Sequence, residues 1–241
     1  MFLNNNSIGD FKNLLWDSQR CQRNWNLTKT IPSEDIELMI HACKSSPSKQ
    51  NEPHFRVYGI ENFNLRKKIY NATLNFAHDA DGVSLCFNND GSINYKRQSQ
   101  LMGNFLFVFC REKNNVYRSG ESYSGGEFVE TDMNVERAGT VDLSTDEKRK
   151  YFQKKTEKIG LHAIGISVGY LLITAHMLGY KTGCSSGFDL DTIVEITGHP
   201  CPEIIVAVGY GDETRDRREE HFERGRLFPS WNKDIKFEII K

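Results

Sequence analysis

The sequence predicts an α+β fold in which a central sheet is flanked by helices. Residues 105–110 and 203–209 are almost entirely apolar and have the length of strands that are buried on both faces. Helical patterns surround them without the regular alternation of strand and helix that builds a parallel sheet. With 241 residues and no internal repeat, the chain is expected to form one domain over residues 1–241.

Three helices and one strand are expected before residue 77. Residues 7–16 carry apolar side chains at helical spacing. Pro32 and the polar residues after it form a helix start, and the apolar repeat that follows should end near Lys44. Residues 55–60 alternate as a strand, and residues 65–76 are expected to form the third helix.

The middle of the chain is expected to contain two loops and a long helical region. Residues 77–96 have the composition of a loop. Residues 117–142 are rich in Gly, Ser, Glu and Thr without a clear period, which predicts a mobile loop over the active site. A capping box at residues 144–147 opens a charged helix, which either precedes or merges with an apolar helix that ends at Gly179 or Gly183.

The apolar helix at residues 159–180 could in principle be a membrane-spanning segment or a buried helix of a soluble protein. Its length matches the roughly 20 apolar residues that cross a bilayer. It also contains His162, His176 and several glycines, which are poor neighbours for lipid, so we expect a buried helix and no membrane association. Gly165 and Gly169 lie four residues apart and form a smooth stripe that a second subunit could approach.

Three further segments complete the expected elements. Asp191 is expected to cap a brief helix that ends at Ile196. Residues 212–223 are densely charged and should be solvated. Residues 235–240 alternate as a final strand, which would add to a sheet edge.

The composition argues against some classes of binding partner and favours one cellular compartment. The net charge is −1, from 31 basic and 32 acidic residues, so no nucleic-acid or anionic membrane partner is expected. The six cysteines are scattered without a C-x-x-C pair, which favours reduced thiols and the cytoplasm. The first residues lack a basic and apolar leader, so no signal peptide is expected. Histidine spacing gives no metal site.

Two arginine pairs stand near opposite ends of the sequence. Arg20 and Arg23 lie in the stretch Gln-Arg-Cys-Gln-Arg-Asn-Trp, and Arg224 and Arg226 in the stretch Arg-Gly-Arg-Leu-Phe-Pro. Guanidinium groups stay charged and donate in bidentate fashion to phosphate oxygens. We therefore predict a phosphate site closed by both pairs, with solvated surface arginines as the alternative. Three arginines of the charged run are expected to be solvated: Arg215, Arg217 and Arg218.

Two motifs between these pairs complete a family pattern. A Pro-Ser-x-x-Asn loop is formed by Pro47, Ser48 and Asn51, and a Ser-Ser-Gly-Phe turn follows the apolar helix. In order and separation the four motifs resemble those of the FMN-dependent nitroreductase family, most clearly over residues 17–61 and 158–228. Three departures stand out: Gln19 replaces the first Arg, Cys21 replaces a Ser, and Asn51-Glu52-Pro53 is a contracted form of the family's N-x-Q-P.

The resemblance implies a nitroreductase-like central mixed sheet flanked by helices, in an intertwined homodimer. It also implies a set of FMN-binding residues: Arg20, Cys21, Arg23, Pro47, Ser48, Asn51, Lys96, Ser185, Ser186, Gly187, Arg224 and Arg226. The Pro-Ser-x-x-Asn loop would cover the flavin from the other subunit, and the turn at 185–187 would bring a backbone N–H to flavin N5. The alternatives are an ordinary turn and a helix C-cap with a left-handed glycine.

Lys96 and Arg97 precede the strand at 105–110. A basic residue at the N1 and O2 edge of a flavin stabilises its reduced, anionic form. The resemblance assigns this position to Lys96, and two solvated bases are the alternative.

The implied activity is an FMN oxidoreductase. NAD(P)H, as NADH or NADPH, would reduce the bound FMN and leave, and a nitroaromatic, quinone or similar small-molecule electron acceptor would then take its place, which gives ping-pong kinetics. No side-chain nucleophile is required. Two alternatives remain open: a flavin carrier or redox sensor without turnover, and a specialised reductive branch of the superfamily such as a dehalogenase or a flavin-fragmenting enzyme.

Overall fold

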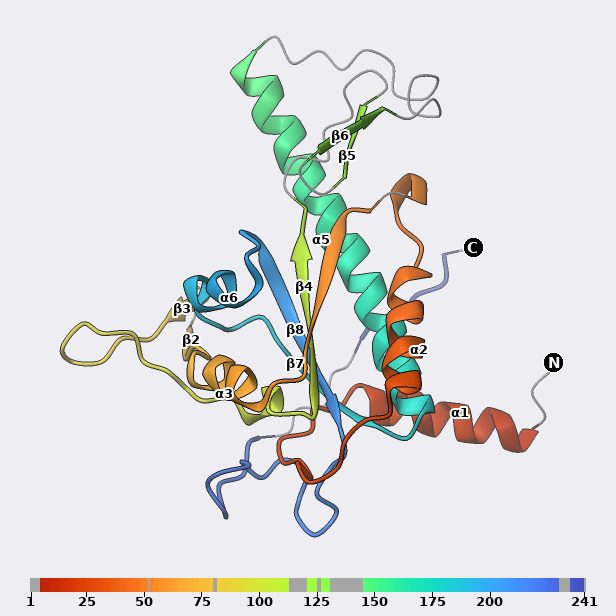
Figure 1. Ribbon diagram of the computed structural model, residues 1–241, viewed down its shortest axis with the longest axis vertical. Helices are drawn as coiled ribbons and strands as arrows, with labels where there is room; N and C mark the ends of the chain where they lie inside the picture. The colour runs from red at the N-terminus through yellow and green to blue at the C-terminus, as the bar shows by residue number, and fades with distance from the viewer. Residues whose placement is uncertain are drawn as a thin grey trace.

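A four-stranded sheet lies between two layers of helices (Figure 1). The computed structural model describes residues 5–51, 53–79, 82–112, 121–124, 127–130, 145–229 and 235–240. The strand order is β1 (Phe55–Ile60), β4 (Phe105–Arg111), β8 (Pro202–Gly209) and β7 (Lys181–Ser185). The α+β prediction is therefore confirmed. The strand pairs are antiparallel throughout, so the parallel pairing that makes a sheet mixed is not found among the described strands.

The two central strands send alternate side chains to opposite helix layers, as a period of two requires. One core cluster contains the β4 residues Leu106, Val108 and Cys110. It also includes residues of α3 (Phe63–Asn71) and α6 (Leu190–Thr197). The other core cluster contains the intervening β4 residues Phe105, Phe107 and Phe109. It also includes residues of α2 (Ser33–Lys44) and α5 (Asp146–Met177). Both faces of the sheet are thus covered (Figure 1).

Helix α5 is a single helix of 32 residues. Thr145 caps it by accepting a hydrogen bond from Lys148 N at 3.2 Å, so the charged and apolar parts merge. Its Glu157–Met177 part is long and apolar enough to cross a membrane by length and composition alone, although core helices of soluble proteins share this property. Leu171 and Ala175 are fully buried against the sheet, as expected of a core helix.

The remaining elements are short. Helix α1 (Asn5–Ser18) packs against α5, and two 3-10 helices, η1 (Lys49–Asn51) and η2 (Ser99–Leu101), precede β1 and β4. Two hairpins are separate from the main sheet: β2 (Phe76–Asp79) with β3 (Gly82–Leu85), and β5 (Glu121–Ser124) with β6 (Glu127–Glu130). Apart from this second hairpin, the predicted loop at 117–142 lies outside the described residues.

Several predicted elements agree with the structure, and others required correction. The elements predicted at 7–16, 33–44, 55–60, 105–110 and 203–209 are α1, α2, β1, β4 and β8. The helix predicted at 65–76 ends at Asn71, because Leu74 N–H bonds to Gly187 O at 3.0 Å and Asn75 N–H to Asn94 O at 3.0 Å. The predicted loop at 77–96 contains most of the hairpin in which β2 pairs with β3.

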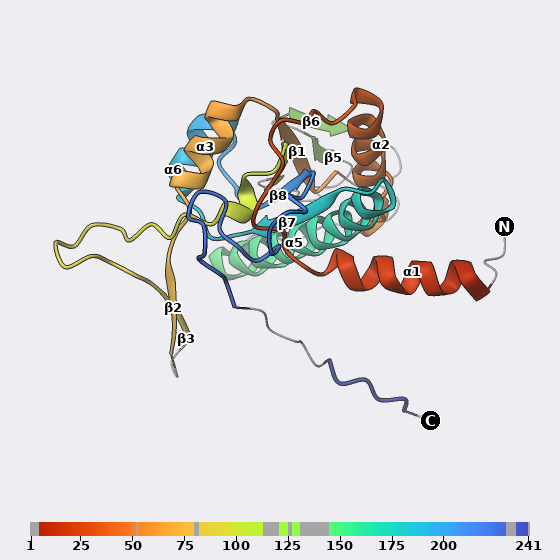
Figure 2. The ribbon, with the colours of Figure 1, turned by 90° about the horizontal axis from the view of Figure 1, so that it is seen from below.

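The C-terminal third also differs from expectation. Asp189 rather than Asp191 caps α6, by accepting a hydrogen bond from Thr192 N at 3.0 Å. The left-handed glycine after α5 is Gly179, with φ of +87°, whereas Gly187 follows the unpredicted strand β7. The helix C-cap alternative for Gly187 is therefore wrong. Residues 235–240 form no strand in the described chain and lie away from the sheet (Figure 2).

Candidate functional site

Residues 19–25 and 212–229 lie side by side, although they come from opposite ends of the sequence. Arg23 N–H donates to Arg217 O at 2.8 Å, and the Asn24 side chain donates to Glu219 O at 3.2 Å. Trp25 N–H donates to His221 Nδ1 at 3.2 Å. We call these two joined segments the arginine clamp. These contacts join residues 23–25 to residues 217–221, directly before the late basic motif.

The buried carboxylate of Glu220 stabilises the conformation of residues 212–229. Glu220 is fully buried and accepts hydrogen bonds from Tyr70 Oη at 3.0 Å, Phe222 N at 2.6 Å and Glu223 N at 2.5 Å. Burial, followed by the adjacent Glu220 carboxylate, raises the pKa of Tyr70, so the phenol remains a donor. Arg215 was expected to be solvated, but its side chain is only 8% exposed and donates to Glu220 O at 2.6 Å, so that prediction is wrong.

Arg23 is the central cation of the arginine clamp. Its Nη1 atom is buried and has no hydrogen-bond partner in the described structure. Its guanidinium carbon lies 3.9 Å from the Phe228 ring centre, and that of Arg226 lies 5.3 Å from the same ring. Burial lowers the pKa of Arg23. A buried donor without a partner costs free energy, so this atom is available to an acceptor such as a water molecule or an anion.

The other predicted arginines are less closely placed. Arg20 lies 4.0 Å from the Asp17 carboxylate and stacks on Trp16 of α1, and it lines a cavity of about 190 Å³ together with Arg217. Arg224 is exposed. Arg217, which was expected to be solvated, is partly buried and donates to Cys21 O at 3.3 Å. The structure thus brings Arg23 and Arg226 together and adds Arg217 to the predicted set.

Cys21 and Cys184 lie on neighbouring segments at the base of the clamp. The Cys184 thiol is the main reason that the pKa of Cys21 is lowered to about 6. The backbone N–H of Cys184 and the charges of Arg23 and Arg217 act in the same direction, and burial opposes them. The pKa of Cys184 is raised, mainly by the Cys21 thiol. The segments are held together by a Gln22 N–H to Thr182 O hydrogen bond of 2.8 Å.

The turn at 185–187 lines an open cavity of about 450 Å³. We call this the turn cavity, and it is lined by Phe76, Gln98, Cys184, Ser185, Ser186, Gly187 and Ile204. A Cβ on Gly187 would lie 2.9 Å from Phe76 Cε2, so only glycine fits there without displacing the ring. Lys96 reaches the neighbourhood of the turn because its N–H pairs with Thr73 O at 3.0 Å, next to the segment that pairs with Gly187.

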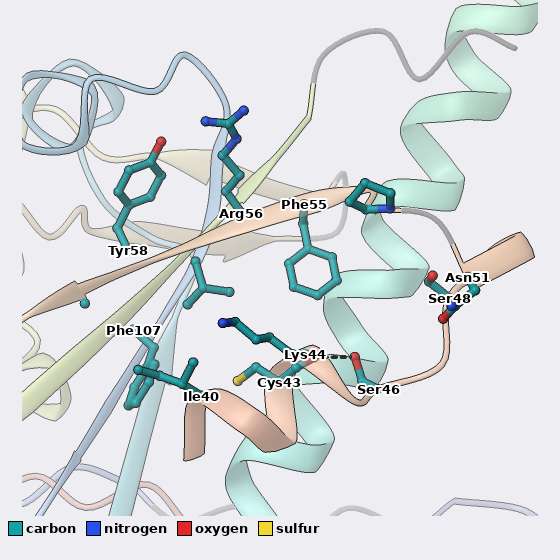
Figure 3. A pocket seen from close by; sticks show the side chains of 13 residues that line it. Ile40, Cys43, Lys44, Ser46, Ser48, Asn51, Phe55, Arg56, Tyr58 and Phe107 are labelled. Atoms are coloured by element: carbon teal, nitrogen blue, oxygen red, sulfur yellow. Dashed lines mark hydrogen bonds between the residues drawn. The ribbon is translucent and has the colours of Figure 1, made fainter. Parts of the chain in front are cut away.

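The Pro-Ser-x-x-Asn loop lies elsewhere. Ser48 and Asn51 line a cavity of about 690 Å³ between α2 and the sheet, and Ile40 and Phe107 lie toward its other end (Figure 3). We call this the β1 groove, because residues 55–59 of β1 also line it. Pro47 is exposed, and Asn51 has a φ of +60°. The β1 groove and the turn cavity share no lining residue. A single chain therefore does not bring this loop to the predicted flavin turn.

Sequence reasoning missed several residues of this region: Arg217, Phe228, Cys184, Phe76 and Gln98. Arg217 was hidden in a run of like charges, and only the pairing of its carbonyl with Arg23 turns it inward. Cys184 was interpreted as core filler because its partner thiol is distant in sequence. Nothing in the local pattern signals either contact.

Comparison with known proteins gives one family. The model of the Nitroreductase family matches residues 17–212. No curated protein sequence matches the chain.

Solved structures with a similar fold include a nitroreductase-like protein from Streptococcus mutans, with 17% identity and a TM-score of 0.59 over 95% of this chain and 100% of that one. A Staphylococcus epidermidis protein assigned as an NAD(P)H:FMN oxidoreductase has 16% identity and a TM-score of 0.55, with 94% of both chains covered. An Exiguobacterium sibiricum protein assigned as a nitroreductase, in complex with FMN, has 16% identity and a TM-score of 0.55, with 93% of both chains covered. At these identities the likeness shows the fold.

Proposed function

The chain belongs to the nitroreductase family, and from this premise we propose that it is an FMN-dependent oxidoreductase in which NAD(P)H is the electron donor. A nitroaromatic, a quinone or a similar small molecule would be the acceptor. The observation that carries the proposal is the unpartnered, buried Nη1 of Arg23 in the arginine clamp. The family resemblance and the FMN complex of a structural neighbour support the choice of cofactor.

The donor set of the arginine clamp fits a phosphate monoester. The guanidinium groups of Arg23 and Arg226 both contact the Phe228 ring, and Arg226 also pairs with Glu223 at 2.8 Å at the surface. Arg217 comes from the same late segment and donates to Cys21 O at 3.3 Å. Burial lowers the pKa of both Arg23 and Arg217, which indicates positive charge that an anion would stabilise. A phosphate with several oxygens can satisfy more than one guanidinium at once. We therefore assign the FMN phosphate to this clamp.

The turn cavity would then receive the isoalloxazine ring. Gly187 N–H already donates to Ser185 Oγ at 3.1 Å, so the backbone N–H proposed to reach flavin N5 is that of Ser186. Lys96 is proposed to lie at the N1 and O2 edge, where its charge would stabilise the reduced ring. When bound, FMN would supply the electron transfer in both half-reactions. The chain's residues bind and orient it, and the cavity's open side leaves one ring face for donor and acceptor in turn.

A homodimer would bring the missing loop to this site. Residues 235–240 expose four apolar side chains, with 77% of Ile235, 84% of Phe237, 75% of Ile239 and 96% of Ile240 accessible. Helix α5 exposes an apolar face around Gly165 and Gly169, and a Cβ on either glycine would meet no atom within 4 Å. Exposed apolar area of this kind favours association. We propose that Pro47, Ser48 and Asn51 of one subunit cover the FMN of the other.

The same family supports a soluble protein, and we propose the cytoplasm as its compartment. The free state of all six cysteines is compatible with a reducing environment.

Titration of purified protein with FMN and with riboflavin tests the proposed function. Riboflavin lacks the phosphate, so the arginine clamp predicts that FMN binds about 100-fold more tightly. Anaerobic addition of NADH or NADPH should then bleach the flavin absorption, and a quinone should restore it. Absence of FMN binding would refute the function, and equal affinity for the two flavins would refute the phosphate assignment.

A second candidate is a flavin carrier or redox sensor. It is favoured by Cys21, which stands where the family has a serine and whose pKa is lowered to about 6, mainly by the Cys184 thiol. In that case FMN would bind with the same preference over riboflavin, but neither NADH nor NADPH would bleach it.

A further inference from the structure

The turn cavity presents one aromatic surface to a ligand. Among the described residues that line this cavity, Phe76 carries the only aromatic ring, and Ile204 is the other large apolar side chain. The Phe76 side chain is partly exposed. No Lys, Arg, Asp or Glu belongs to the described lining, so the lining offers no ion pair to a charged ligand. A planar ligand would be held by the Phe76 ring and by the polar groups of the turn.

Backbone hydrogen bonds fix Phe76 beside the turn. Leu74 N–H donates to Gly187 O at 3.0 Å, and Asn75 N–H donates to Asn94 O at 3.0 Å. Phe76, the next residue, begins β2, which pairs with β3 along its whole length. The position of Phe76 is therefore set by hydrogen bonds to two other segments of the chain.

Gly187 provides the space that the Phe76 ring occupies. A Cβ at position 187 would lie 2.9 Å from Phe76 Cε2 and 3.5 Å from Phe76 Cδ2, so an alanine there would displace the ring. The turn itself is fixed by a hydrogen bond of 3.1 Å from Gly187 N–H to Ser185 Oγ. The ring thus lies directly against the turn at 185–187, which is the part of the cavity proposed to meet flavin N5.

We propose that Phe76 determines acceptor specificity, because its ring contacts planar aromatic acceptors in the turn cavity. This inference rests on the proposed FMN-dependent oxidoreductase function. Aromatic rings attract one another in offset or edge-to-face arrangements, and this attraction adds to the free energy of apolar burial. A quinone with a fused aromatic ring gains this contact, whereas a small inorganic acceptor such as ferricyanide does not.

The test compares 2-methyl-1,4-naphthoquinone with ferricyanide as acceptors. For each NAD(P)H oxidised, one quinone takes up two electrons and two protons, one of them from solvent, or two ferricyanide ions take up one electron each and a proton is released. Phe76→Leu, which keeps an apolar side chain without a ring, should lower kcat/KM for the quinone by about 3-fold to 10-fold. The value for ferricyanide should not change. Phe76→Tyr is the matched control and should retain the wild-type ratio of the two values.

Gly187→Ala tests the same contact from the other side. Displacement of the ring should lower the ratio of the quinone value to the ferricyanide value in the wild type. In Phe76→Leu, which lacks the Cε2 atom, the added Gly187→Ala should leave this ratio unchanged. If Phe76→Leu fails to fold, the ratio in the single Gly187→Ala variant decides.

A binding measurement without turnover completes the test. The affinity of the oxidised, FMN-loaded protein for the quinone, followed by flavin fluorescence without NAD(P)H, should fall by the same factor in Phe76→Leu. An unchanged quinone affinity, or equal losses of kcat/KM for both acceptors, would overturn the role of Phe76. A wild-type protein that reduces ferricyanide with neither NADH nor NADPH would instead refute the proposed function on which this role rests.

Discussion

The arginine clamp and the β1 groove are built in opposite ways. The clamp joins residues 19–25 to residues 212–229 by hydrogen bonds between distant segments, and Asn24 and Glu220 within it are fully buried. The β1 groove is an open cavity beside an edge strand, and its loop residues Pro47 and Asn51 are exposed. The difference agrees with our proposal that one half of the cofactor site is assembled within each chain and that a second subunit completes the other half.

Of the changes that test this difference, loss of the apolar C-terminal side chains should have the largest effect, and the quantity that changes is the free energy of dimerisation. We expect Phe237→Ser with Ile239→Ser to weaken dimerisation by about 4 kcal/mol, or roughly 1,000-fold, because each buried side chain contributes about 1.5–3 kcal/mol. Analytical ultracentrifugation measures the change. The control is Lys236→Ser with Glu238→Ser in the same segment. An unchanged dimer in the apolar variant would show that this segment is not the contact.

Removal of the central guanidinium should be the next largest effect. Arg23→Ala is expected to lower FMN affinity by about 2–3 kcal/mol, or roughly 30-fold to 150-fold, because charge-assisted hydrogen bonds to the phosphate are lost. Riboflavin binding should change far less. Isothermal titration calorimetry gives both values. Arg218→Ala is the matched control, since Arg218 pairs with Asp216 at 2.8 Å at the surface. Equal losses for the two variants would contradict a specific clamp.

The Cys21 thiolate should make stability depend on pH. Its pKa is lowered from 9.0 to about 6 in the folded chain, so the unfolded chain binds more protons between these values. Stability should rise from pH 6 to pH 9 by about 1 kcal/mol per pH unit, and this contribution is lost as the pH falls through 6. The raised pKa of Cys184 acts in the opposite sense only above pH 9. Urea unfolding of the wild type and of Cys21→Ser at each pH measures the difference, and identical slopes would contradict the lowered pKa.

The smallest expected effect concerns the loop of the β1 groove. Ser48→Ala should weaken FMN binding by about 0.5–1.5 kcal/mol, the usual contribution of one hydrogen bond. Because the contact is proposed to cross the subunit boundary, the effect should vanish in the Phe237→Ser, Ile239→Ser monomer. Flavin fluorescence titration of both backgrounds measures it. A loss of the same size in the monomer would place Ser48 in its own subunit's site.

Local patterns predicted the elements whose stability is local or is set by strong apolar character. Helix α2 has its Pro32 start and its apolar repeat in one stretch, and β4 is apolar along its whole length. Strand β7 was missed because Lys181–Ser185 has little apolar character and depends on its pairing with β8. The end of α3 was set too late for the same reason, since Leu74 takes a partner in a distant segment.

In the candidate site, too, local patterns predicted some features, whereas tertiary contacts decide the others. The motif order predicted that the two basic segments are related, and the backbone contacts show that they meet. Side-chain packing decides where each arginine lies: Arg23 and Arg226 contact the Phe228 ring, whereas Arg20 stacks on Trp16 and lines a separate cavity with Arg217. The Gln22 N–H to Thr182 O hydrogen bond brings the segment of Cys21 beside the segment of Cys184, and the sequence neighbours of neither cysteine encode this pairing.

Helix α5 sets a mechanical limit on the molecule. At 1.5 Å per residue, its 32 residues form a rod of about 48 Å. It packs against α1, which leads into residues 19–25, and against α2, which leads into the loop at 47–51. An uninterrupted rod provides no hinge between these two attachment points. For the proposed oxidoreductase, we therefore expect substrate entry to rely on side-chain and short-segment motions rather than on a slow closure of two lobes.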